Sequence, residues 1–130
     1  MDLTIIIVSF KSGEILDRCL DSIDDKYPVI IVENSLNKDL KNHLKKKYKN
    51  VDCILPNQNL GYGAGNNLGI EKAKTKYLLI LNPDTILQNN TLDELLISAK
   101  KIKNFAILGP KIIEGDKINE KEINYNNLKK

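Results

Sequence analysis

An aspartate at the expected end of a buried strand is the first candidate for chemistry in this chain. The apolar residues 78–81 run directly into Asn82, Pro83 and Asp84, and a short apolar run that ends in turn residues is typical of a buried strand. Pro83 has no backbone N–H for a sheet ladder, so the strand should stop at about Asn82. Asp84 would then lie at the carboxyl end of that strand, where open α/β sheets bind their ligands.

The Asp84 carboxylate has no lysine or arginine beside it in the sequence. A carboxylate in such a position suits a hard divalent cation that also contacts phosphate oxygens. A plain turn before the next helix is the alternative, because Asn, Pro and Asp are also common turn residues. The Asn-Pro-Asp corner therefore has two interpretations, a site where a metal ion binds phosphate and a plain turn.

Strand and helix patterns alternate along the chain. Almost wholly apolar, β-branched runs predict strands covered on both faces, and apolar residues at helical spacing predict the helices between them. Asp39 would cap the second helix, and Thr91 with Glu94 would form a capping box that starts the fourth. This order predicts an α/β fold with right-handed crossovers and a largely parallel sheet. The expected strands are residues 3–8, 29–32, 51–55, 77–81 and 106–110, with a further one starting at residue 111.

Residues at the ends of the first two strands are expected near the Asn-Pro-Asp corner. If the first and fourth strands are neighbours, the crevice between them is a topological switch point, where such sheets bind ligands. Ser9 and Phe10 would face the corner across this crevice, and Glu33 and Asn34 would line one wall. Glu33 could accept hydrogen bonds from a base or a ribose, with an ordinary polar strand end as the alternative. Core packing is the alternative to base stacking for Phe10.

A glycine-rich segment follows the third expected strand. Residues 61–67 read Gly-Tyr-Gly-Ala-Gly-Asn-Asn, and alternate glycines let a loop backbone approach a ligand or a helix closely. The helix expected after this loop, through Leu68, Ile70 and Ala73, would offer its N-terminus to an anion. A flexible turn is the alternative. The glycine spacing differs from the Gly-x-Gly-x-x-Gly dinucleotide fingerprint, and the segment follows the third expected strand and not the first. Both differences disfavour a nicotinamide or flavin oxidoreductase.

Composition argues against several other classes of protein. The 130 residues suit one domain. The net charge is +3, and almost all of the positive charge is carried by lysine, with Arg18 as the single arginine. Proteins that read nucleic acids rely on arginine and stacking aromatics, so no nucleic-acid partner is expected. Cys19 and Cys53 lie in apolar patterns, which predicts buried free thiols in a reducing cytosol.

The location expected from the sequence is cytoplasmic. No secretion signal is visible at the N-terminus, and no apolar run reaches the ~20 residues of a membrane span. The lysine-rich helices leave a peripheral contact with the inner face of a membrane open, and a solvated helix face is the alternative explanation for them.

Four segments of the sequence together resemble the pattern of glycosyltransferase family 2, in particular its rhamnosyltransferase-like members. Each motif is weak alone, but four in this order at suitable spacing make a specific signal. The resemblance extends from Leu3 to about Ile113, and residues 114–130 form a polar C-terminal tail outside the domain of residues 1–113. The segments are Val8-Ser9-Phe10, Val32-Glu33-Asn34-Ser35, residues 59–69 and Leu81-Asn82-Pro83-Asp84-Thr85, with residues 109–112 as a further match.

The resemblance implies a Rossmann-like GT-A fold, a three-layer αβα sandwich with a mostly parallel sheet, truncated relative to full-length members. It implies inverting transfer from a nucleotide-diphosphate sugar donor to a glycan or lipid-linked acceptor, in polysaccharide or cell-envelope glycan synthesis. Asp84 would be the remaining carboxylate of an Asp-x-Asp motif and hold Mg²⁺ or Mn²⁺. The residues implied for the nucleotide site are Val8, Ser9, Phe10, Glu33, Asn34, Gly61, Gly65, Asn66, Asn67 and Asn82.

Two residues depart from the family pattern, and no general base is recognised. Asn82 stands where the metal motif begins with Asp, and Glu33 stands where Asp is usual. In the family, the base and the acceptor site come from a part that follows the region matched here, and nothing marks an acidic residue of the tail as a base. Transfer would then need a partner chain, a homodimer or a longer form.

Two alternative functions remain at this level. The first is a catalytically silent fragment that binds a nucleotide sugar. The second, less favoured, is a nucleotidyltransferase-like enzyme, which should carry a basic, glycine-rich loop directly after the first strand. Residues 10–13 read Phe-Lys-Ser-Gly and are poor in glycine and arginine.

Overall fold

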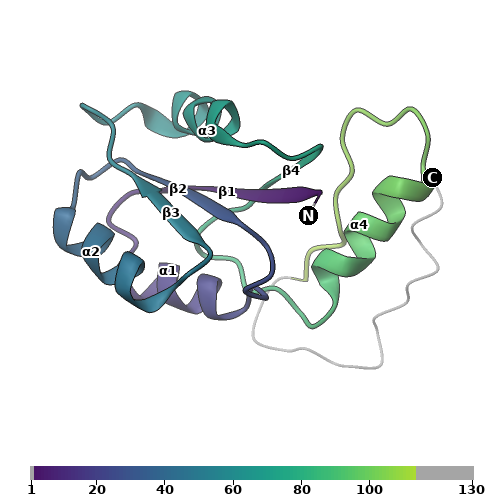
Figure 1. The fold of residues 1–130 in the computed structure, drawn as a ribbon, viewed down its shortest axis with the longest axis horizontal. Coiled ribbons are helices and arrows are strands. Elements are labelled where there is room, and N and C mark those ends of the chain that lie inside the picture. The colour runs from purple at the N-terminus through teal and green to yellow at the C-terminus, as the bar shows by residue number, and fades with distance from the viewer. Residues whose placement is uncertain (1, 114–130) are drawn as a thin grey trace.

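The computed structural model describes residues 2–113 and contains one parallel sheet with helices on both faces. In chain order the elements are β1 (Leu3–Ser9), α1 (Gly13–Asp21), β2 (Val29–Glu33), α2 (Lys38–Lys47), β3 (Val51–Ile54), α3 (Gly61–Lys72), β4 (Tyr77–Ile80) and α4 (Thr91–Lys101). Figure 1 shows α3 on one face of the sheet and α1 and α2 on the other, with α4 beside β4. The predicted three-layer αβα architecture is therefore confirmed.

The sheet has the order β3-β2-β1-β4, and every pairing between neighbours is parallel. Ser9 lies opposite Glu33 in the β1–β2 pair, and Ile6 lies opposite Ile80 in the β1–β4 pair. The chain thus builds outward from β1 to β3 and returns to the other side of β1 with β4. The predicted adjacency of the first and fourth strands is confirmed, and their carboxyl ends form a switch point at one edge of the sheet.

The main hydrophobic core lies between the sheet and the layer formed by α1 and α2. Ile5 and Ile7 of β1, Leu16 of α1 and Leu44 of α2 are fully buried there, because alternate strand residues face the same side. Burial of each such side chain contributes roughly 1.5–3 kcal/mol to stability. Leu92 of α4 joins the same cluster. The core therefore holds β1 firmly in the middle of the sheet.

On the opposite face, glycines let α3 pack directly on the sheet. A Cβ atom on Gly69 would lie 2.6 Å from Ile6 Cγ2, and one on Gly65 would lie 3.1 Å from both Val8 methyl groups. These glycines are four residues apart and so share one helix face. The prediction that residues 61–67 form a loop is wrong, because α3 already begins at Gly61. Contact with the sheet outweighs the poor helix propensity of glycine.

Alanine at two of these glycines should change stability in opposite directions. Gly69→Ala should lower the free energy of unfolding by about 2 kcal/mol, because the added methyl group overpacks against Ile6. Gly63→Ala should raise it by about 0.5 kcal/mol, because that position has open space and alanine is the better helix former. Urea unfolding of the two variants measures both changes. A Gly69→Ala protein as stable as wild type would contradict the close packing of α3.

Three local predictions differ from the structure. The second helix is capped by Asn37, whose side chain accepts from the Leu40 backbone N–H, and not by Asp39. The fourth helix begins after Asn90, which has a φ of 64°, so the Thr91 capping box does not form. Residues 106–113 contain no strand, and Ile107 is 92% exposed. No described strand lies beyond β4 to pair with that apolar run.

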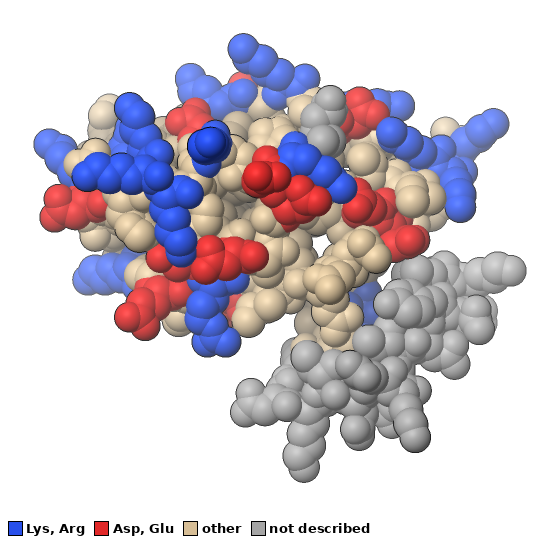
Figure 2. Space-filling model, turned by 60° about the horizontal axis from the view of Figure 1, so that its bottom comes forward, with Lys and Arg blue, Asp and Glu red and all other residues tan. Residues whose placement is uncertain are grey.

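The face formed by α1 and α2 carries charges of both signs, which Figure 2 shows interspersed on that side of the molecule. Lys47 lies 3.2 Å from Asp21, and His43 lies 2.9 Å from Asp17, so both pairs join α2 to α1. Exposed pairs of this kind are screened by solvent and contribute little to stability.

None of the helices in the described part of the chain combines the length and hydrophobicity needed to cross a bilayer. The predicted polar tail of residues 114–130 lies outside the described residues.

Candidate active site

A pocket of about 580 Å³ opens at the carboxyl ends of β1 and β4. This volume falls in the range of small-molecule and cofactor sites, which is roughly 300–1,000 Å³. The pocket occupies the switch point, so the predicted crevice exists where the topology places it. Its lining residues are Val8, Phe10, Lys11, Ser12, Ile15, Tyr62, Asn82, Pro83 and Asp84.

Three apolar side chains line the β1 side of the pocket. Val8 is the residue before the last one of β1, and Phe10 and Ile15 extend from the turn and from the first turn of α1. Phe10 is 51% exposed, so the core-packing alternative for Phe10 is wrong, and Ile15 beside it is 52% exposed. An exposed aromatic face beside aliphatic groups is a surface on which a planar ring can stack.

The opposite wall is polar and is formed by the Asn-Pro-Asp corner after β4. The corner is a turn in which the Thr85 backbone N–H donates to the Asn82 carbonyl at 3.2 Å. Asn82 and Asp84 both line the pocket, as the sequence predicted. Pro83 prevents the strand from continuing, which leaves the Asp84 side chain exposed at the end of the sheet.

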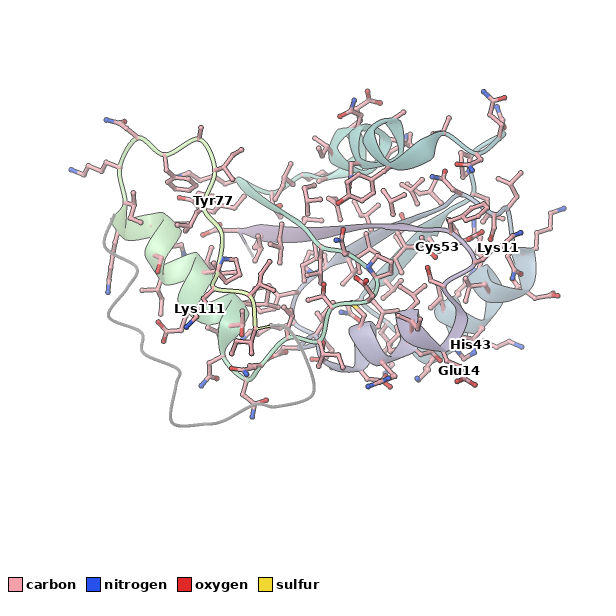
Figure 3. All side chains as sticks on the ribbon, turned by 180° about the vertical axis from the view of Figure 1, so that it is seen from behind. Lys11, Glu14, His43, Cys53, Tyr77 and Lys111 are labelled. Atoms are coloured by element: carbon pink, nitrogen blue, oxygen red, sulfur yellow. The ribbon has the colours of Figure 1, made fainter. Side chains whose placement is uncertain are left out.

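Lys11 supplies the positive charge of the pocket and was not recognised in the sequence. Its backbone has a φ of 52°, and its Nζ atom lies 5.3 Å from the centroid of the Phe10 ring. Figure 3 shows Lys11 at the opposite end of the sheet from Tyr77. A lysine next to a phenylalanine directly after an apolar strand was the signal available in the sequence. Lys11 and Asp84 are thus the charged residues lining the pocket.

Glu33 lies outside the pocket lining and is fully buried. Its carboxylate accepts from the Ser35 backbone N–H at 3.2 Å, the Ser35 hydroxyl at 2.5 Å and the Asn37 backbone N–H at 2.8 Å. These bonds hold the turn between β2 and α2. The predicted contact between Glu33 and a base remains a prediction. Ser9, its neighbour in register, is also fully buried and does not line the pocket.

Asn34 joins the end of β2 to the start of α3. Its Nδ2 donates to the Gly61 carbonyl at 3.0 Å, and its Oδ1 accepts from the Leu60 backbone N–H at 3.2 Å. Its own backbone N–H donates to the Ser9 carbonyl at 2.8 Å. Asn34 therefore fixes the position of the α3 N-terminus relative to β1 and β2, and it does not line the pocket.

The glycine-rich segment contributes to the pocket through Tyr62. Gly61, Gly65, Asn66 and Asn67 do not line the pocket; Gly65 and Asn66 are buried and Asn67 is exposed. The Tyr62 hydroxyl reaches Asn82 Oδ1 at 2.9 Å. Sequence reasoning missed Tyr62, although an aromatic residue between two glycines was a signal. The predicted nucleotide contacts of the other four residues remain predictions.

Both cysteines are free and buried, as predicted. Burial raises the pKa of the Cys19 thiol to about 11, with the nearby Asp84 charge as a smaller cause. Burial likewise raises the pKa of the Cys53 thiol to about 11. Thiols with such pKa values are protonated at neutral pH and are poor nucleophiles. The Cys19 thiol instead donates a hydrogen bond to the Asn82 backbone carbonyl of the Asn-Pro-Asp corner, at 3.7 Å.

Sequence comparison places the chain among known proteins. The family model described as Glycosyl transferase family 2 matches residues 4–129. The chain belongs to glycosyl transferase family 2. This assignment confirms the resemblance carried by the four sequence segments.

Curated family 2 relatives transfer sugars, and this chain spans about 40% or less of their length. It is 30% identical over 125 residues to the Low-salt glycan biosynthesis hexosyltransferase Agl10 of Haloferax volcanii, covering 92% of this chain and 40% of that protein. It is 29% identical over 109 residues to Rhamnosyltransferase WbbL of Escherichia coli, covering 77% and 40%. A third relative is the poly(ribitol-phosphate) beta-glucosyltransferase of Bacillus spizizenii, 31% identical over 102 residues, covering 71% and 16%.

Solved structures with the same fold include S. aureus TarS. The crystal structure of TarS 1-349 superposes with a TM-score of 0.66 at 18% identity, covering 78% of this chain and 33% of that chain. A second TarS crystal structure gives a TM-score of 0.65 at 15% identity, covering 78% and 20%. The GT-A fold predicted from the sequence is confirmed, and the family 2 chain described here is part of such a fold.

The donor set of this family 2 pocket fits a divalent cation only when phosphate is present. Asp84 is the one carboxylate among the lining residues, and no group of three or more His, Cys, Asp or Glu residues gathers within the described range. Mg²⁺ is commonly held by one or two carboxylates together with substrate phosphates and water. Asp84 would therefore hold Mg²⁺ or Mn²⁺ jointly with a bound diphosphate.

Proposed function

We propose that this family 2 chain binds a nucleotide-diphosphate sugar in the pocket between β1 and β4. The observation that carries the proposal is the pairing of an apolar, partly aromatic wall with a polar corner across one pocket. Val8 and Phe10 would contact the base, and Asp84 and Lys11 would lie near the diphosphate. The sugar transferases among the curated relatives support the same reading.

The reaction we propose is inverting transfer of the sugar to a hydroxyl of a glycan or lipid-linked acceptor. The acceptor oxygen forms a bond to the anomeric carbon while the bond to the nucleoside diphosphate breaks, and the hydroxyl proton passes to a base. A bound Mg²⁺ or Mn²⁺ would offset the negative charge on the leaving diphosphate. Lys11 would add a positive charge on the β1 side, and Asn82 a polar contact beside Asp84.

Binding without transfer by this chain alone is the second candidate. Asp84 is the one carboxylate lining the pocket, and a residue that holds the cation is not free to act as the base. The chain also spans 40% of the hexosyltransferase relative. In this reading a partner chain, a homodimer or a longer form supplies the base and the acceptor site.

Titration with nucleoside diphosphates tests the proposed function. UDP, dTDP and GDP are added with and without Mn²⁺, and binding is followed by calorimetry and thermal unfolding. Metal-enhanced binding of at least one of them is expected, and no binding of any would overturn the proposal. Adding nucleotide sugars and measuring release of the free diphosphate then separates transfer from binding alone.

The cellular setting we propose is polysaccharide or cell-envelope glycan synthesis in the cytoplasm, at or near the inner face of the membrane. Two buried free thiols support a reducing compartment. The glycan biosynthesis role named for the Haloferax volcanii relative supports the pathway class. Fractionation of cells that produce the tagged protein would test the compartment.

A further inference from the structure

One hydrogen bond spans the pocket from α3 to the corner after β4. The Tyr62 hydroxyl lies 2.9 Å from Asn82 Oδ1, and both residues line the pocket. No other hydrogen bond of the Asn82 side chain occurs within residues 2–113. A tyrosine hydroxyl carries one proton, and the amide oxygen can only accept. In this bond Tyr62 therefore donates and Asn82 accepts.

Both partners of this bond are held in place by their own surroundings. Tyr62 lies in the first turn of α3, where its backbone carbonyl accepts from Asn66 Nδ2 at 3.1 Å. Asn34 fixes the preceding residue, Gly61, to the sheet. The Asn82 carbonyl accepts from the Cys19 thiol and from the Thr85 backbone N–H. The contact is thus set by two rigid supports, one on each side of the pocket.

We propose that Tyr62 is a positioning residue that engages the Asn82 amide oxygen and turns its N–H₂ group toward the ligand. Asn82 then donates hydrogen bonds to an oxygen of the diphosphate and is not a ligand of the cation. This inference rests on the proposed function and assigns a role to the residue that replaces the first aspartate of the metal motif.

The charges of the pocket explain why a donor is useful at this position. The Asp84 carboxylate repels a diphosphate when no cation lies between them, and Lys11 is the one cationic side chain among the lining residues. Two N–H donors from Asn82 offset part of that repulsion without adding charge. An aspartate at the same position would accept from Tyr62 equally well, but its second oxygen would face the ligand with a negative charge.

The Tyr62→Phe variant tests the positioning role. It removes the hydroxyl and keeps the ring, and we expect metal-free UDP to bind roughly three- to tenfold more weakly, as for loss of one oriented hydrogen bond. The matched control is Tyr48→Phe, which removes a hydroxyl bonded to Asp21 on the α1–α2 face and should leave UDP affinity unchanged. An unchanged affinity in Tyr62→Phe would overturn the inference.

The Asn82→Asp variant tests the donor role of Asn82, because its effect on UDP affinity should differ between metal-free and Mn²⁺-saturated protein. Without metal, UDP should bind to this variant at least tenfold more weakly than to wild type, because the two N–H donors of the amide are replaced by a negatively charged carboxylate oxygen. With saturating Mn²⁺, binding should recover to wild-type affinity or better, because a second carboxylate faces the cation. Equal metal-free binding by Asn82→Asp and wild type would overturn the donor role.

A measurement without ligand separates this inference from the proposed function. The side-chain amide signal of Asn82 is identified in a ¹⁵N-labelled protein by its loss in Asn82→Asp, and we expect Tyr62→Phe to shift it. If wild type binds no nucleoside diphosphate, the proposed function and the donor role both fail. If wild type binds UDP but the amide signal is the same in Tyr62→Phe, only the positioning role of Tyr62 is overturned.

Discussion

Replacing Asp84 by alanine should abolish the metal-dependent part of nucleoside-diphosphate binding. Asp84 is the one carboxylate lining the pocket, so Mn²⁺ would lose its protein ligand. For wild type, UDP with Mn²⁺ at 100 times the dissociation constant should stabilise the fold by about 2.7 kcal/mol. That stabilisation corresponds to a rise in melting temperature of roughly 10 °C for a domain of this size. The rise should disappear in Asp84→Ala when thermal unfolding is followed with both ligands present.

The matched control for Asp84→Ala is Asp25→Ala. Asp25 is an exposed carboxylate in the turn before β2, at the edge of the sheet away from the pocket. Its removal changes the net charge equally and should leave the UDP- and Mn²⁺-dependent rise intact. A full rise in the Asp84→Ala protein would show that the cation, if bound, is held elsewhere.

Replacing Glu33 by glutamine should lower the free energy of unfolding by about 3 kcal/mol. The carboxylate is fully buried and accepts from three donors of the β2–α2 turn. An amide group places an N–H₂ against at least one of those donors, which loses a charge-assisted bond and leaves a buried donor without a partner. Urea unfolding measures the change, and an unchanged slope of free energy against urea confirms a two-state comparison.

Glu71→Gln is the control for the Glu33 experiment, because Glu71 is exposed on α3 and its substitution should change stability by less than about 0.5 kcal/mol. The variant also separates two roles for Glu33. Wild-type stability with loss of UDP affinity would favour the predicted contact with a base. Lower stability with normal affinity of the remaining folded protein would favour the turn-forming role.

The sheet and the pocket edge were predictable because they depend on local pattern and on topology. The strands read as short apolar runs, and right-handed crossovers leave few arrangements for them. Pro83 marks the end of β4 by its missing N–H. The switch point between β1 and β4 followed from the order of the elements, and it correctly brought Phe10 and Asp84 to one pocket.

The features that sequence reasoning missed depend on contacts between distant parts of the chain. Helix α3 begins at Gly61 and packs closely on the sheet through Gly65 and Gly69, where an added Cβ atom would approach Val8 and Ile6. Glycine has a poor helix propensity, so the local sequence predicted a loop where the structure has the start of a helix. The Tyr62–Asn82 bond joins two segments through three-dimensional packing, and no residue spacing predicts it.

The hydrogen-bond donors of the Glu33 carboxylate could not be predicted from the sequence either, for a different reason. The turn after β2 contains Leu36 with a φ of 59°, a backbone conformation that is uncommon for a residue with a branched side chain. That turn brings the Ser35 and Asn37 N–H groups to the carboxylate. A polar residue at a strand end reads the same way in sequence whether it faces a ligand or its own turn.

The two shielded thiols make this protein convenient for attaching a single reporter group. Cys19 and Cys53 are buried with pKa values of about 11, so maleimide reagents at neutral pH meet almost no native thiolate. Lys74 is exposed in the turn before β4, at the edge of the sheet remote from the pocket. A cysteine introduced there offers one accessible attachment point for a fluorophore, and the ligand site stays untouched.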